Sequence, residues 1–166
     1  MPTRRWSRGH PTRCQRDCGG DVPVVTTTVT YDGVEVGEQL PHRSFPITRA
    51  DLVRYAGASG DFNPIHWNAR FAVEVGLPDV IAHGMFTMAT AVRLVTDWIG
   101  DPGAVVDYSV RFTKALVVPD DEGGATLDVD GVVAEKLEGG LVRIDLTARS
   151  DGDKVLGMAR ATVRLS

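Results

Sequence analysis

The stretch 84–99 reads GMFTMATAVRLVTDWI and is the longest helical pattern in the chain. Apolar side chains recur in it at every third or fourth position: Met85, Met88, Ala89, Val92, Val95 and Ile99. Gly100 and Pro102 follow and are typical of a helix end. Because most of the other side chains are apolar too, we expect this helix to be buried on most sides. The rest of the fold should then be built around it.

Four segments after this helix show the period-two alternation of β-strands. They are 104–113, 125–133, 141–148 and 155–165, with Gly- and Asp-containing turn sequences between them. Alternation of this kind favours an antiparallel sheet with one solvated face. One more strand is expected before the helix, at 43–47. The predicted fold class is therefore α+β, with an antiparallel sheet wrapped around one long apolar helix.

Two shorter helical patterns precede the long one. The segment 49–58 follows the N-cap candidate Thr48, with Asp51 three positions further on as a variant of the capping box. The segment 69–75 follows Asn68, another residue type that favours helix N-caps. The residues between these two helices form a predicted loop.

The composition is typical of a single globular domain. The chain has 166 residues, of which 43% are hydrophobic and 24% are charged. The formal net charge of −4 does not indicate nucleic-acid binding. No apolar run approaches the roughly 18 to 20 residues of a membrane span, so neither nucleic acid nor membrane is an expected partner. The only cysteines, Cys14 and Cys18, exclude a disulfide framework for the core, and this favours a cytoplasmic location.

The first residues differ from the rest of the chain. Residues 1–24 lack a hydrophobic period and are rich in Arg, Gly, Pro and Thr, which predicts a disordered tail or a mis-called start. Residues 25–166 then form one domain. His10, Cys14 and Cys18 lack the usual spacing and the fourth ligand of a zinc site, and no glycine-rich nucleotide loop follows a strand. We therefore expect no metal and no cofactor.

The loop between the short helices concentrates side chains suited to acid–base chemistry. Asp61 and His66 lie five positions apart with Pro64 between them, a spacing that does not suit one helical face. A neutral histidine can accept a proton near neutral pH, and Asp61 could transfer one if apolar neighbours enclose it. Those neighbours are Phe62, Ile65 and Trp67. Asn63 is expected to brace the loop through its own backbone.

Gly84, at the start of the long helix, adds a second element. The N-terminus of a helix presents free N–H groups and the positive end of the helix dipole, and glycine permits close approach of a substrate carbonyl. This combination can stabilise an oxyanion. Spacing alone still favours the ordinary interpretation, with Asp61 in a turn and both His66 and His83 in structural roles.

Two motifs in this region resemble those of a known family. Residues 55–66 read YAGASGDFNPIH and residues 82–85 read AHGM. Together they resemble the hydratase motif of the MaoC-like, R-specific enoyl hydratases and dehydratases. The resemblance runs from Val34 to the C-terminus, and segments 100–105 and 108–112 look most like the catalytic beta subunits of actinobacterial (3R)-hydroxyacyl-ACP dehydratases. It implies a hot-dog fold, in which a sheet wraps around one long helix.

The resemblance also implies roles for individual residues. The catalytic acid and histidine of the family correspond to Asp61 and His66, its oxyanion glycine to Gly84, and Asn63 is a positioning residue of the motif. The homodimeric hydratases carry a serine eight residues after that glycine. Here the position is Val92, so no serine role is carried over and the homodimeric subtype is less favoured.

Three functions are compatible with these features. The first is reversible dehydration of (3R)-3-hydroxyacyl thioesters, carried on acyl carrier protein (ACP), in type II fatty-acid synthesis. That enzyme would act as a dimer of hot-dog subunits, with a hetero-dimer favoured. The second is a homodimeric (R)-specific enoyl-CoA hydratase. The third is a non-catalytic hot-dog partner subunit, against which the intact Asp61, His66 and Gly84 argue.

Overall fold

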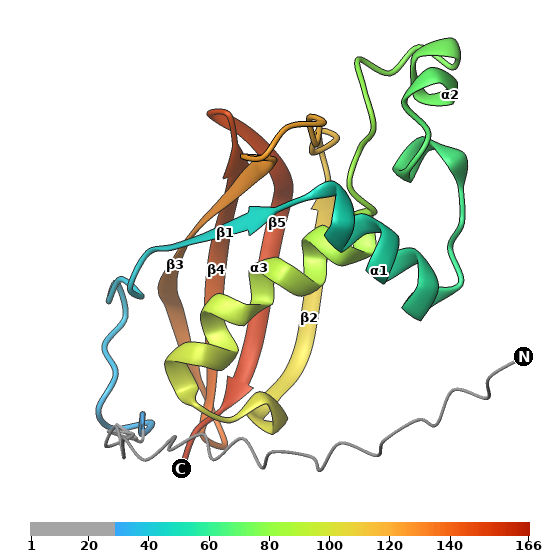
Figure 1. The fold of residues 1–166 in the computed structure, drawn as a ribbon. Helices are drawn as coiled ribbons and strands as arrows, with labels where there is room; N and C mark the ends of the chain where they lie inside the picture. Colours follow the sequence, from blue (N-terminus) through green and yellow to red (C-terminus); the bar gives the residue numbers. More distant parts are fainter. Residues whose placement is uncertain (1–28) are drawn as a thin grey trace, which may run out of the picture.

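The computed structural model describes residues 29–166, so the expectations for residues 1–24 lie outside its range (Figure 1). With η marking a short 3-10 helix, the elements are β1 (Arg43–Ile47), α1 (Arg49–Ser59), η1 (Pro64–His66), α2 (Ala69–Glu74), α3 (Gly84–Ile99), η2 (Pro102–Ala104), β2 (Val105–Phe112), β3 (Ala125–Leu137), β4 (Leu141–Ser150) and β5 (Asp153–Arg164). The first strand and the long helix have the predicted bounds. The predicted strand 125–133 is longer and continues to Leu137.

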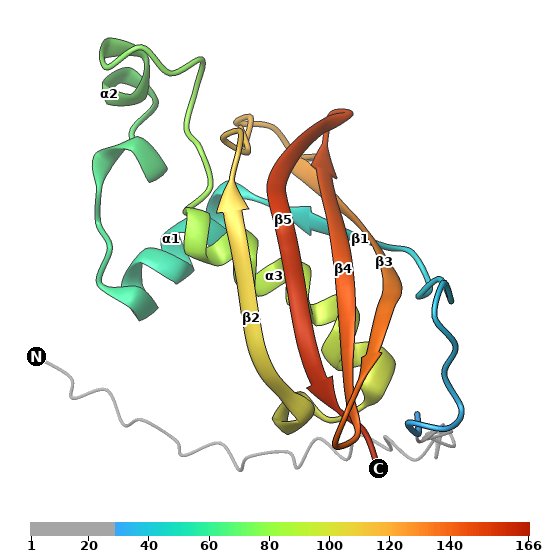
Figure 2. The ribbon, with the colours of Figure 1, turned by 180° about the vertical axis from the view of Figure 1, so that it is seen from behind.

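Within the described residues, the strands form one antiparallel sheet in the order β1-β3-β4-β5-β2. α3 lies across one face of this sheet (Figure 1), and Figure 2 shows the other face. The core lies between these layers, where Leu94 and Val95 of α3 and Ile144 of β4 are at most 2% exposed. The predicted α+β layout, a sheet around one long helix, is confirmed.

α3 is less enclosed than its sequence predicts. Its buried side chains share one side of the helix: Thr87, Thr90, Ala91, Leu94, Val95 and Ile99. Met85 and Ala89 are exposed, and Arg93 and Asp97 continue this stripe along the helix. Positions four apart lie on the same side of a helix. The expectation of burial on most sides is therefore wrong for this stripe, because the sheet covers only the opposite side.

Side-chain caps set where the two shorter helices begin. The Thr48 hydroxyl accepts from the Asp51 N–H at 3.3 Å, and the Asp51 carboxylate accepts from the Thr48 N–H at 2.9 Å. This reciprocal pair is the predicted capping box. Asn68 caps α2 by accepting from the Phe71 N–H at 3.1 Å. α1 and α2 lie to one side of the sheet, and α2 projects beyond it (Figures 1 and 2).

A β-bulge in β5 is a feature that the alternation pattern does not predict. The pairing of β5 with β4 and with β2 shifts register at Gly157 and Met158. Met158 has φ of 48°, in the left-handed region that is uncommon for residues other than glycine. The bulge follows directly on Val155 and Leu156, which line the cavity described below.

None of the helices in the described part of the chain is long and apolar enough to cross a bilayer.

Candidate active site

Short side-chain-to-backbone hydrogen bonds shape the loop that carries Asp61 and His66. The Asp61 carboxylate accepts from the Asn63 N–H at 3.2 Å, and the Asn63 side chain accepts from the Ile65 N–H at 3.3 Å. Asn63 thereby caps the short helix η1, whose first residue is Pro64 and whose last is His66. The loop is therefore built from the turn-forming residue types that its sequence contains.

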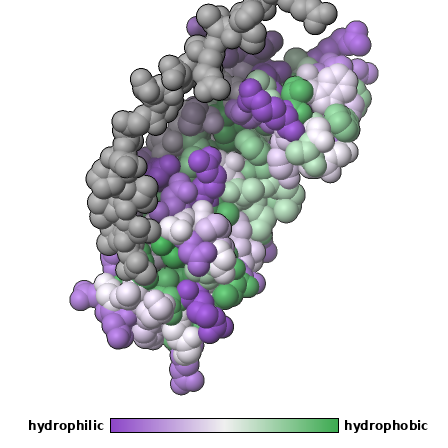
Figure 3. Space-filling view, turned by 60° about the horizontal axis from the view of Figure 1, so that its bottom comes forward, coloured by the Kyte–Doolittle hydropathy of each residue, from purple (hydrophilic) through white to green (hydrophobic). Residues whose placement is uncertain are grey.

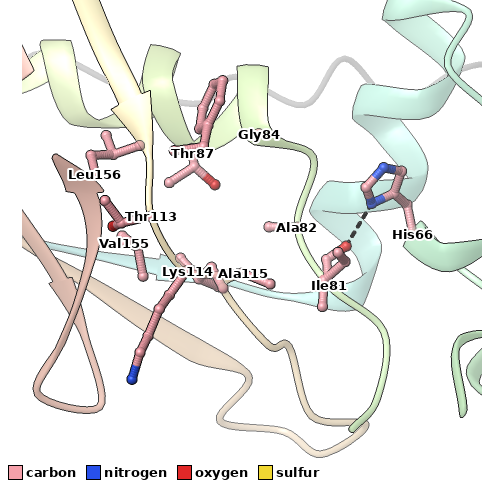
Figure 4. A pocket seen from close by; sticks show the side chains of 12 residues that line it. His66, Ile81, Ala82, Gly84, Thr87, Thr113, Lys114, Ala115, Val155 and Leu156 are labelled. Atoms are coloured by element: carbon pink, nitrogen blue, oxygen red, sulfur yellow. Dashed lines mark hydrogen bonds between the residues drawn. The ribbon is translucent and has the colours of Figure 1, made fainter. Parts of the chain in front are cut away.

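His66 is held in one tautomer by a backbone carbonyl. Its side chain is 9% exposed, and its Nδ1–H donates to the Ile81 carbonyl at 2.8 Å (Figure 4). In the neutral ring, Nε2 then carries the free lone pair. Burial lowers the pKa of His66 below its usual 6.5, with His83 acting in the same direction and Ile81 and Asp61 opposing it. Nε2 is therefore a base that is ready to accept a proton at neutral pH.

Asp61 lies beside His66 but is not enclosed. The Asp61 Oδ2 atom is 4.0 Å from His66 Nε2, and the Asp61 side chain is 53% exposed. Phe62 is 62% exposed and Trp67 is 48% exposed. The expectation that these apolar neighbours shield Asp61 is wrong for the chain by itself, because both rings are turned outward.

His66 and Gly84 line the same cavity, which has a volume of about 300 Å³. Figure 4 shows Gly84 and Thr87 on α3 above it, His66 on one side and Leu156 on the other, with Lys114 extending away. The remaining lining residues are Ile81, Ala82, Phe112, Thr113, Ala115 and Val155, with Leu116. The predicted residues His66 and Gly84 are thus brought to one space, with Asp61 next to His66.

Gly84 is the first residue of α3. Among the described residues, no hydrogen-bond acceptor is recorded for its N–H group, as expected for the first turn of a helix. A Cβ atom at this position would lie 3.2–3.4 Å from the Phe112 ring. A side chain at this position would therefore crowd the Phe112 ring, which lines the same cavity.

His83 is a residue of the site that sequence reasoning placed only as a structural histidine. It is 1% exposed, and its ring stacks on that of His66 with centroids 3.8 Å apart and planes inclined by 23°. Its Nε2–H donates to the Asp61 carbonyl at 3.1 Å. The available signal was its position directly before Gly84 in the AHGM motif.

The fold also brings together three potential metal ligands, which the sequence patterns did not indicate as a group. One ligand atom from each of Asp61, His66 and His83 lies within 4.8 Å of the others. The lone pair of an imidazole nitrogen lies in the ring plane, and the planes of His66 and His83 are stacked and nearly parallel. Two stacked rings do not direct their lone pairs to one nearby point, so this arrangement does not suit shared coordination.

Comparisons with known proteins find a matching family, similar chains and similar folds. The profile of the family described as "MaoC like domain" matches residues 33–149. The chain is 44% identical over 85 residues to 3-hydroxyacyl-thioester dehydratase X of Mycobacterium tuberculosis. This match covers 51% of this chain and 29% of that protein. The matched part of this chain therefore spans less than a third of the length of that curated relative.

Two solved structures share the fold. A structure described as a MaoC-like dehydratase is 41% identical, with a TM-score of 0.81, covering 84% of this chain and 43% of that one. The R-hydratase PhaJ1 from Pseudomonas aeruginosa is 28% identical, with a TM-score of 0.72, covering 83% of this chain and 86% of that one. The expected hot-dog fold is confirmed.

Proposed function

Because the chain belongs to the MaoC-like domain family, we propose that it catalyses the reversible dehydration of (3R)-3-hydroxyacyl thioesters to trans-2-enoyl thioesters. The observation that carries this proposal is one shared cavity. It presents His66, whose Nδ1 is fixed on the Ile81 carbonyl, together with the glycine N-terminus of α3. A base and an oxyanion donor are the two groups that proton abstraction next to a thioester requires.

The reaction begins at His66. Its free Nε2 removes a proton from C2 of the hydroxyacyl thioester, and negative charge develops on the thioester oxygen. The Gly84 N–H, at the positive end of the α3 dipole, donates to that oxygen. One well-placed donor is typically worth about 3 kcal/mol at such an oxygen.

Asp61 completes the elimination. As the C3–O bond breaks and the C2–C3 double bond forms, the Asp61 carboxyl group donates the proton that leaves with the hydroxyl as water. His66 then returns its proton to Asp61, 4.0 Å away, and this resets both groups. Donation requires a protonated Asp61, so bound substrate and a second subunit must provide the cover that the chain alone does not.

A second hot-dog subunit is proposed at the free edge of β2. Of the two edges of the sheet, β1 is five residues long and contains Pro46, which cannot donate to a neighbouring strand. β2 is eight residues long and exposes Val106 and Phe112 by about half. Phe112 also lines the cavity, so a subunit at this edge would lie next to the site.

We propose that the second subunit is a different hot-dog chain and that the thioester is carried by ACP in type II fatty-acid synthesis. Both statements derive from the sequence resemblance and from the absence of a serine at Val92. A cytoplasmic location likewise stays a prediction.

The test measures formation of the enoyl thioester by the full-length chain, with any subunit that co-purifies, on matched ACP and CoA substrates. His66→Ala and Asp61→Asn should each lower kcat at least about 100-fold. His42→Ala is the matched control, because His42 is exposed and pairs with Asp130 on the sheet. Full activity of either site variant in folded protein would contradict the assignment, and a higher kcat/KM on CoA would favour the enoyl-CoA hydratase.

A further inference from the structure

His83 contacts all three elements of the proposed site. Its ring packs on the His66 ring at 3.8 Å, and its Nε2–H holds the Asp61 carbonyl at 3.1 Å. Its own carbonyl accepts from the Thr87 N–H at 3.0 Å in the first turn of α3, where the next residue is Gly84. His83 thereby connects Asp61 and His66, through its ring, with the start of α3, through its backbone.

The ring of His83 is itself enclosed by its surroundings. It is 1% exposed, and the Tyr55 ring packs on it at 4.9 Å. Because Nε2 donates to a carbonyl, Nδ1 carries the lone pair of the neutral ring, and this buried atom has no hydrogen-bond partner among the described residues. A ring that is so enclosed and donates a hydrogen bond to Asp61 is well placed to hold its neighbours.

We propose that His83 is a positioning residue of the catalytic pair. Its stacked ring fixes the plane of His66, and its N–H···O bond fixes the backbone of Asp61, so that it sets the separation between the Asp61 carboxyl group and His66 Nε2. This inference rests on the proposed dehydratase function. It assigns to His83 no contact with substrate and no proton transfer.

The cost of losing such a residue follows from the geometry. Asp61 belongs to an exposed loop whose backbone is held by short side-chain caps from Ser59 and Asn63. A displacement of about 1 Å between reacting groups can lower a rate about 100-fold. Removing the His83 contacts should therefore lower kcat, with little change in how the thioester is bound.

Two variants separate the contacts of His83. His83→Phe keeps an aromatic ring against His66 and removes the donor to Asp61. His83→Gln keeps a donor of similar reach and removes the ring. The control is Tyr55→Phe, which retains the ring that packs on His83 and removes only a hydroxyl group. Circular dichroism and thermal unfolding verify that each full-length variant is folded.

We expect His83→Phe to lower kcat about 10- to 100-fold with KM within about threefold of wild type. His83→Gln should recover part of the loss, and Tyr55→Phe should match wild type. The decisive measurement combines His83→Phe with Asp61→Asn. If His83 acts through Asp61, adding His83→Phe to the Asp61→Asn variant should lower its residual kcat by less than about twofold.

Several results would overturn the proposal. One is wild-type kcat in folded His83→Phe and His83→Gln. Another is an equal fold-loss from His83→Phe with and without Asp61→Asn, which would mean that the two residues act independently. If His83→Phe does not fold, a kcat loss in folded His83→Gln with unchanged KM still decides the question. Absence of dehydration by the wild type would instead refute the proposed function.

Discussion

The Nδ1 atom of His66 lies 2.8 Å from the carbonyl oxygen of Ile81, fifteen residues further along the chain. This bond selects the tautomer in which Nε2 is unprotonated and leaves that atom for chemistry. Ile81 is held in turn, because its N–H donates to the Ile65 carbonyl at 3.2 Å. The two segments thus fix each other across the loop, and His66 cannot turn without breaking a short hydrogen bond.

The first prediction concerns pH. Burial lowers the pKa of His66 from 6.5, so the neutral base persists below that pH and is lost only at more acidic values. We expect kcat/KM to fall on the acid side with a midpoint below 6.5, since this limb reports the free enzyme. Circular dichroism at each pH controls for unfolding. An acid limb centred above 6.5 would contradict the assignment of His66 as the base.

The second prediction concerns the capping box of α1. Thr48→Ala removes the side chain that accepts from Asp51 N–H and should lower the free energy of unfolding by about 1 kcal/mol. The matched control is Thr96→Ala on α3, where the hydroxyl makes only a 3.4 Å contact with the Arg93 carbonyl. Denaturant unfolding measures both. An equal loss in the two variants would show that the cap contributes nothing specific.

Much of the fold can be predicted from the sequence because its signals are local. The bounds of β1 and α3, and the caps at Thr48 and Asn68, depend on neighbours within a few positions. The residue types of the site are local signals as well. Asp61, Asn63 and His66 stand out in a loop that their own side chains shape.

Features that depend on distant packing could not be predicted in the same way. The exposure of Asp61 depends on the orientation of the Phe62 and Trp67 rings, both of which are exposed. The stacking of His83 on His66 needs the fold to bring two segments together. On the face seen in Figure 3, green apolar side chains lie among purple polar ones, and periodicity alone does not show which of them a partner would cover.

The third prediction tests the edge of β2 as the subunit interface. Val106 is 49% exposed on this edge strand, so Val106→Lys should place a charge where the second subunit docks and weaken assembly. Sedimentation velocity over a range of concentrations measures the change. Val36→Lys is the matched control, because Val36 is 61% exposed in the segment before β1. A wild-type chain that is active and monomeric, or an unchanged assembly in Val106→Lys, would exclude this interface.

The last prediction concerns the space in front of the α3 N-terminus. Gly84→Ala keeps the N–H group but places a Cβ atom 3.2–3.4 Å from the Phe112 ring, where it obstructs the approach of a carbonyl oxygen. We expect kcat/KM to fall at least about tenfold, less than the 100-fold or more for complete loss of an oxyanion donor. Gly57→Ala is the matched control, because a Cβ there meets nothing within 4 Å, and it should keep full activity with stability raised by up to about 1 kcal/mol.

A second substitution separates obstruction of substrate from crowding of Phe112. In Gly84→Ala combined with Phe112→Leu, the new methyl group no longer meets the edge of the aromatic ring. If crowding alone causes the loss, the double variant should recover relative to Phe112→Leu. If the methyl group blocks the carbonyl oxygen, Gly84→Ala should cost the same factor in both backgrounds. We expect the second outcome, because Gly84 lines the cavity that the thioester would enter, and full recovery would show that crowding of Phe112 alone causes the loss.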